Sequence, residues 1–145
     1  MELNELTKEI LGAAFHVHTV MGAGLLESVY ATALIYELRK RGMQVAAEVV
    51  IRPAGKLPPA SVTGMQVAAE VVIPVLYEGV DLGLSFRADL IVDGRVILEI
   101  KSVQALSPIH SKQLLNYLKL TGLPIGLLLN FNTISLRDQI VRLMN

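Results

Sequence analysis

Apolar residues recur along this chain with two different periods, which predict helices in some stretches and strands in others. Spacings of three and four residues predict helices over residues 4–20 and 25–41. A third helix is expected over 108–120, because Ser107 followed by Pro108 is typical of a helix start. Short runs rich in Val, Ile and Leu predict strands at 72–77, 80–84, 87–92, 95–102 and 124–131, and a terminal hairpin at 134–144.

The strongest hairpin signal lies in residues 87–102, which read RADLIVDGRVILEIKS. Its central Asp-Gly separates two apolar runs, a pattern typical of a tight turn between antiparallel strands. The charged residues Asp89, Glu99 and Lys101 interrupt these runs. Glu99 and Lys101 are two residues apart, so they share one face of a strand. Charges on one face of an otherwise apolar strand indicate either a functional site or a surface ion pair.

The length of the turn decides where Asp89 points. A two-residue loop would place Asp89 on the face opposite Glu99. A three-residue loop, Val92-Asp93-Gly94, pairs Asp89 with Ile97 and brings it to the face of Glu99 and Lys101. We predict the three-residue loop, because it gathers the three charges in one place.

Such a group of charges has a definite chemistry. Two carboxylates on adjacent strands can hold a hard divalent cation whose remaining ligands are water and substrate oxygens. Lys101 beside them can stabilise the charge that develops on a phosphate, or orient the attacking water. The alternative is structural: Glu99 forms a surface ion pair with Lys101 or Arg87 at a sheet edge.

Three further motifs accompany the Asp89…Glu99-Ile100-Lys101 spacing. They are a G-x-x-E-x-x-Y stretch at 24–30, QLLNYLKL followed by Thr-Gly at 113–122, and GLLLNF at 126–131. In this order they resemble the bacterial GxxExxY protein family, a branch of the PD-(D/E)XK nuclease superfamily. The resemblance covers nearly the whole chain. It implies a single α/β domain over 1–145, with a restriction-endonuclease-like core of mixed β-sheet flanked by helices, and Mg²⁺-dependent phosphodiester cleavage, with Mn²⁺ as a substitute.

The resemblance also gives roles to residues outside the hairpin. It implies that Glu27 is an additional metal ligand, directly or through water, whereas a carboxylate in the first turn of a helix is also favoured by the helix dipole alone. Tyr30 is interpreted as a core aromatic whose hydroxyl holds a neighbouring group. The Ile100 carbonyl is expected to be a further metal ligand, and Gln113 resembles the glutamine that supports the metal-bound water or the substrate.

Three charged or titratable residues are candidates for substrate contacts. Arg87 has the same strand parity as Asp89, so it can reach a phosphate beside the metal or remain a surface charge. His110 lies on the same helix face as Gln113, where it can bind phosphate, act as a general acid or have no role. Lys112 adds local positive charge to the same helix.

A perfect internal repeat interrupts this family-like pattern. The ten residues GMQVAAEVVI occur at 42–51 and again at 64–73, with the Pro-rich stretch RPAGKLPPASVT between them. We interpret 42–63 as an insertion consisting of a duplicated strand and a linker. Because the two copies are identical, only connections distinguish them, and we expect the second copy to occupy the native strand position. The first copy is then a spare strand that can add to a sheet edge of its own chain or of a partner and support a homodimer or a strand swap, or it is a loop without structure.

The composition of the chain limits how it can attract a nucleic acid, which metal ligands it has and whether it spans a membrane. The formal net charge is zero, so a nucleic-acid partner must be attracted by a local basic patch. The absence of cysteine excludes disulfides and thiolate metal sites, and no apolar run reaches the roughly 18 residues of a membrane span. We expect a cytoplasmic protein. The alternatives to a nuclease are a non-catalytic module that binds nucleic acid or protein and retains a relic site, and a purely structural oligomer, which gives no reason for an intact site.

Overall fold

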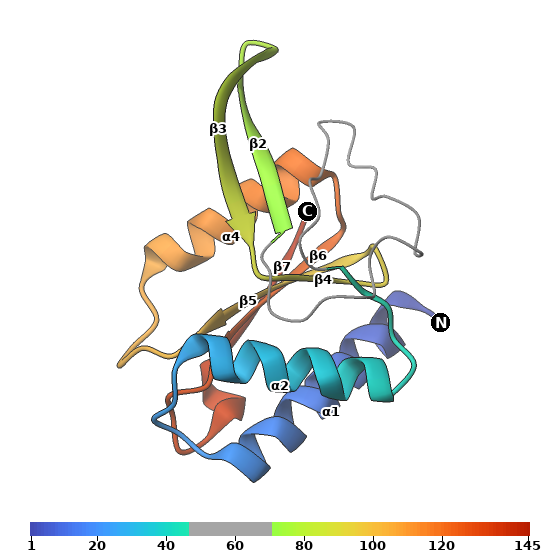
Figure 1. Cartoon of the computed structure of the whole chain (residues 1–145), viewed down its shortest axis with the longest axis vertical. Helices are drawn as coiled ribbons and strands as arrows, with labels where there is room; N and C mark the ends of the chain where they lie inside the picture. Colours follow the sequence, from blue (N-terminus) through green and yellow to red (C-terminus); the bar gives the residue numbers. More distant parts are fainter. Residues whose placement is uncertain (47–70) are drawn as a thin grey trace.

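The computed structural model describes residues 1–46 and 71–145, and the helices and strands below are those of this part of the chain (Figure 1). The elements are, in order, α1 (Leu3–Met21), α2 (Glu27–Lys40), β1 (Val45–Ala46), β2 (Val71–Tyr77), β3 (Val80–Ala88), β4 (Leu90–Val92), β5 (Val96–Lys101), α4 (Pro108–Thr121), β6 (Ile125–Asn130), the 3-10 helix η1 (Leu136–Gln139) and β7 (Ile140–Met144).

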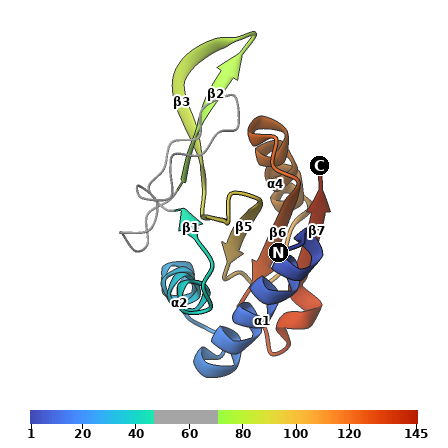
Figure 2. The ribbon, with the colours of Figure 1, turned by 90° about the vertical axis from the view of Figure 1, so that its right-hand side faces the viewer.

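Five strands form a mixed sheet in the order β1-β4-β5-β6-β7. Only β5 and β6 run parallel to each other; the other neighbouring pairs are antiparallel. Helices α1 and α2 lie on one face of the sheet and α4 on the other (Figures 1 and 2). The prediction of a mixed sheet flanked by helices is therefore confirmed.

The side chains of β5 alternate between the two faces. Leu98 and Ile100 belong to the core formed with α1 and α2, whereas Ile97 belongs to the core formed with α4. Since successive side chains on a strand point to opposite faces, Glu99 and Lys101 lie on the α4 face with Ile97. The two charges thus stand at the end of an apolar strand, on the side covered by one helix.

The predicted helices form close to their expected bounds. Ser107 caps α4 by accepting a hydrogen bond from the Ile109 amide, and Gly122, with φ of 71°, ends this helix in the left-handed conformation. Within the described part of the chain, none of the helices combines the length and apolar character needed to cross a bilayer.

The predicted terminal hairpin is wrong. Residues 136–139 form the 3-10 helix η1, and β7 pairs with the earlier strand β6 instead of with its own neighbour in sequence. Leu136 is buried in the core formed with α1 and α2, which explains the turn of helix at this point. Of the predicted hairpin, only the second strand is confirmed, as β7.

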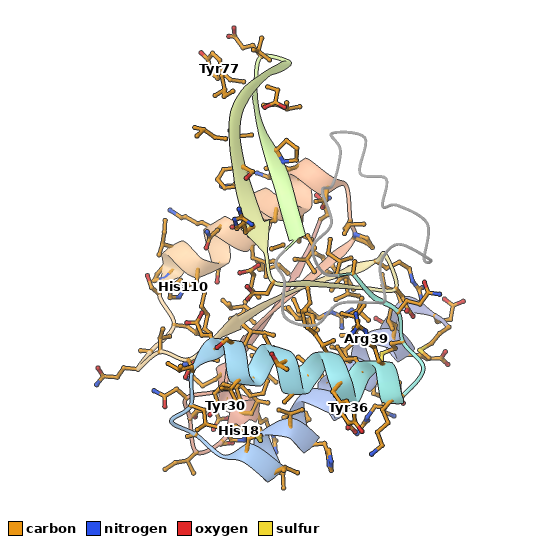
Figure 3. The ribbon with its side chains drawn as sticks, viewed as in Figure 1. His18, Tyr30, Tyr36, Arg39, Tyr77 and His110 are labelled. Atoms are coloured by element: carbon orange, nitrogen blue, oxygen red, sulfur yellow. The ribbon has the colours of Figure 1, made fainter. Side chains whose placement is uncertain are left out.

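Strands β2 and β3 form a separate two-stranded arm that projects from the body of the molecule, with Tyr77 near its tip (Figures 1 and 3). Glu78 and Gly79, which separate the strands predicted at 72–77 and 80–84, form the turn at this tip, and both have positive φ. Near the base of the arm, the Phe86 ring lies 5.7 Å from that of Tyr117 on α4. The arm therefore rests on α4 close to the point where β4 begins.

Both copies of the repeat contribute strand residues. Val45 and Ala46 of the first copy pair with β4 at the edge of the five-stranded sheet, so at these positions the first copy adds to a sheet edge of its own chain. The second copy ends inside β2, where Val71 pairs with Ala88. The predicted dimer contact of the duplicated strand falls mostly on 47–63, which lie outside the described residues.

The pairing of β1 with β4 and the pairing of β2 with β3 follow the same register when equivalent positions of the two copies are compared. If the pairing of β2 with β3 continued backwards from Val71 without a break, Val67 would lie opposite Val92. In the structure, Val92 pairs with Val45, which occupies the same position in the first copy as Val67 does in the second. The first and second copies therefore each supply one part of what a chain without the repeat would build as one strand.

Deletion of residues 42–63 should give a more stable protein with the same fold. The deletion removes 22 of the 145 residues and leaves a 123-residue chain in which a single GMQVAAEVVI runs into β2. The folded state then no longer has to close the connection from Ala46 to Val71, and we expect the free energy of unfolding to rise by about 2 to 3 kcal/mol. Urea unfolding of both proteins measures this, and a shorter protein that is unfolded or less stable would contradict a shared register.

Candidate metal-dependent active site

The candidate site lies at the corner where β4 begins and β5 ends. The turn between these strands leaves three residues, Asp93, Gly94 and Arg95, between the paired Val92 and Val96. The predicted odd-numbered loop is confirmed, although it lies one residue later than expected. Asp93 and Gly94 both have positive φ.

This register brings Asp89 level with Glu99 rather than with Ile97, the predicted partner. The Ile100 amide donates to Asp89 Oδ2 at 2.7 Å, and the Asp89 amide donates to Glu99 Oε1 at 3.1 Å. Glu99 is only 5% exposed. The two carboxylates are therefore held at one corner by backbone amides, and each hydrogen bond restricts the rotamer of the side chain that accepts it.

Lys101 completes the group as the last residue of β5. It shares the face of Glu99, is half-buried, and stands level with Asn130 on the parallel strand β6. Its carbonyl accepts a hydrogen bond from the Phe131 amide at 2.9 Å. The backbone of the lysine is thus fixed between two strands while its side chain points to the α4 face.

A family model described as the PD-(D/E)XK nuclease superfamily matches residues 4–54 and 60–143. The chain belongs to this superfamily. The matched range contains the Asp89…Glu99-Ile100-Lys101 spacing, which has the form D…(D/E)-x-K in the name of the superfamily. The interval between the two matched ranges falls in the Pro-rich linker of the repeat. Searches among curated proteins and among solved structures found no match.

PD-(D/E)XK nucleases generally use divalent metal ions, and the residues at this corner fit such an ion. Two carboxylates close together repel each other, and a cation between them relieves the repulsion. Across residues 1–46 and 71–145, no group of three or more Asp, Glu or His side chains has the arrangement of a metal site. A metal here would therefore have two carboxylate ligands and take its other ligands from backbone, water and substrate oxygens, which Mg²⁺ readily accepts.

Glu27 reaches the same end of β5 from the start of α2. Its Oε2 accepts a hydrogen bond from the Ser102 amide at 3.4 Å, and its side chain is exposed. It does not form a three-acid group with Asp89 and Glu99 in this structure. Glu27, which is expected to bind the metal directly or through water, therefore lies beside the end of the strand that carries Glu99 and Lys101.

The other predicted superfamily residues lie on α4 and β3. Gln113 and Lys112 are exposed in the second turn of α4, and the side chain of Gln113 has no hydrogen bond to a described residue. His110 closes the start of this helix, since its Nδ1 accepts a hydrogen bond from the Ser107 amide at 3.1 Å (Figure 3). Arg87 is exposed on β3, opposite Val72.

Asn130 is a residue of this site that sequence reasoning missed. It is fully buried, its Nδ2 donates to the Val103 carbonyl at 3.0 Å and to Gln139 Oε1 at 3.0 Å, and its Oδ1 accepts from the Val103 amide at 3.1 Å. It therefore fixes the chain two residues after Lys101. The available signal was a lone amide at the end of the apolar run GLLLNF.

The interpretation of Tyr30 is confirmed. The side chain is fully buried, its hydroxyl donates to the Gly22 carbonyl at 2.6 Å and accepts from the Leu25 amide at 3.1 Å. The ring stacks on Phe131 with 4.7 Å between centroids. Tyr30 thus holds the loop between α1 and α2 against the strand end next to the nuclease signature.

Proposed function

We propose that this protein is a metal-dependent nuclease that hydrolyses phosphodiester bonds of DNA or RNA. The observation that carries the proposal is the corner between β4 and β5. There the Ile100 amide binds the Asp89 carboxylate and the Asp89 amide binds the Glu99 carboxylate, while Lys101 lies on the same strand face as Glu99. In a member of a nuclease superfamily, this arrangement has an immediate chemical use. A surface ion pair alone gives no reason for two adjacent carboxylates.

Asp89 and Glu99 would hold Mg²⁺, or Mn²⁺ as a substitute, together with the Ile100 carbonyl. The N–H and C=O of a strand residue point to the same side, and the Ile100 amide points to Asp89, which supports a role for this carbonyl. When bound, the ion supplies Lewis acidity and a water of lowered pKa. Lys101 stabilises negative charge on the phosphate or orients the attacking water.

Substrate contacts are assigned to residues around this corner. His110 has its Nδ1 engaged at the start of α4, so Nε2 is the ring nitrogen that can donate to a phosphate oxygen. Lys112 and Arg87 are exposed cations that can contact the nucleic-acid backbone. Gln113 is assigned to support of the water or substrate, and Glu27 to assistance from the end of β5.

Two finer assignments follow from the sequence. The Gly24, Glu27 and Tyr30 positions support placement in the GxxExxY branch, and the hydroxyl contacts of Tyr30 give this motif a structural purpose. A homodimer through the duplicated strand is also proposed. Light scattering on the full chain and on the chain without 42–63 tests it, since only the full chain should dimerise.

Cleavage of nucleic acid by the full-length protein should depend on a divalent ion. The assay offers duplex DNA, single-stranded DNA and RNA with Mg²⁺ or Mn²⁺, and repeats each reaction with a chelator. We expect cleavage of at least one substrate with metal and none with chelator. Salt-dependent binding without turnover of any substrate would instead favour the non-catalytic binding module.

A further inference from the structure

Ser102, the residue after Lys101, makes two contacts with the start of α2. Its Oγ donates to the Leu25 carbonyl at 2.6 Å, and its amide donates to Glu27 Oε2 at 3.4 Å. These contacts join segments about 75 residues apart in the chain. They connect the end of the strand that carries Glu99 and Lys101 directly to the carboxylate of the G-x-x-E-x-x-Y motif.

The partner of the Ser102 hydroxyl is itself held in place. The Leu25 amide donates to the Tyr30 hydroxyl, which in turn donates to the Gly22 carbonyl. Tyr30 is fully buried against Phe131, whose amide binds the Lys101 carbonyl. The loop that presents the Leu25 carbonyl is therefore anchored to the same strand end, and Ser102 binds a fixed acceptor.

The chain beyond Ser102 is held from the other side. The buried Asn130 binds both the amide and the carbonyl of Val103. With Val103 fixed to β6 and the Ser102 hydroxyl fixed to Leu25, the Ser102 amide has a defined direction, and it points to Glu27. The position of the Glu27 carboxylate is thus set by the strand end and not by α2 alone.

We propose that Ser102 is a positioning residue that seats the Glu27 carboxylate at the end of β5, next to Lys101. Glu27 then acts on the reaction from outside the carboxylate pair, by holding the strand end and its lysine in place, and not as a third direct ligand. This inference rests on the proposed nuclease function for its kinetic consequence. The contact itself exists without that function and can be tested separately.

Hydrogen exchange at the Ser102 amide tests the contact without any activity. Glu27→Gln keeps an oxygen acceptor and Glu27→Ala removes it. We expect protection of this amide in wild type and in Glu27→Gln, and at least tenfold faster exchange in Glu27→Ala. Equal exchange in all three proteins would overturn the proposal, whether or not the protein proves to be a nuclease.

Kinetics test the positioning role. Ser102→Ala should lower kcat about tenfold with little change in KM, since one hydrogen bond is worth about this factor. Ser102→Thr, which keeps the hydroxyl, should restore most of kcat, and Ser28→Ala, an exposed serine beside Glu27, should have no effect. An unchanged kcat in Ser102→Ala would overturn the positioning role. The same holds if kcat falls together with stability and Ser102→Thr restores neither.

Discussion

Asp89→Asn should abolish both metal binding and cleavage while leaving the protein folded. The amide keeps an oxygen that can accept the hydrogen bond of the Ile100 amide, so the strand corner is retained. It loses the negative charge that a hard divalent ion requires. We expect Mn²⁺ affinity measured by calorimetry to fall by at least about 100-fold, and cleavage by about three orders of magnitude.

The matched control for this charge removal is Asp81→Asn. Asp81 is an exposed carboxylate on the β2–β3 arm, and its Oδ1 accepts a hydrogen bond from the Gly83 amide, which the asparagine can keep. Metal binding and cleavage by this variant should equal those of wild type. If Asp89→Asn retains wild-type cleavage, the assignment of the metal site to this corner is wrong.

Lys101→Met should separate metal binding from catalysis. Methionine keeps an unbranched side chain at the end of β5 but cannot stabilise charge on the phosphate. Because removal of one well-placed donor costs about 10² to 10³ in kcat, we expect a loss of this size. Mn²⁺ affinity should remain within a few-fold of wild type or increase slightly, since a positive charge near the ion is gone.

Lys119→Met is the control for this variant, because Lys119 is an exposed lysine in the last turn of α4. It should leave both kcat and Mn²⁺ affinity unchanged. A Lys101→Met protein that cleaves at the wild-type rate would show that the lysine has no catalytic part. Loss of Mn²⁺ binding in the same variant would show instead that it shapes the carboxylate pair.

The sequence by itself determined the local features of this site. The face shared by Glu99 and Lys101 follows from the two-residue period of a strand, and the helix start at Ser107 follows from capping. The odd-numbered loop at Asp93-Gly94 was predicted because it gathers Asp89, Glu99 and Lys101 on one face, although the structure places it one residue later.

Only the tertiary structure decided how distant segments meet. The pairing of β7 with β6, the contact of Glu27 with Ser102 and the two bonds of Asn130 to Val103 join residues far apart in sequence. The two GMQVAAEVVI copies have the same residues, so the sequence could not show that the first copy pairs with β4 and the second with β3. Periodicity and capping report a residue's immediate neighbours, whereas these contacts depend on which elements pack together once the core has formed.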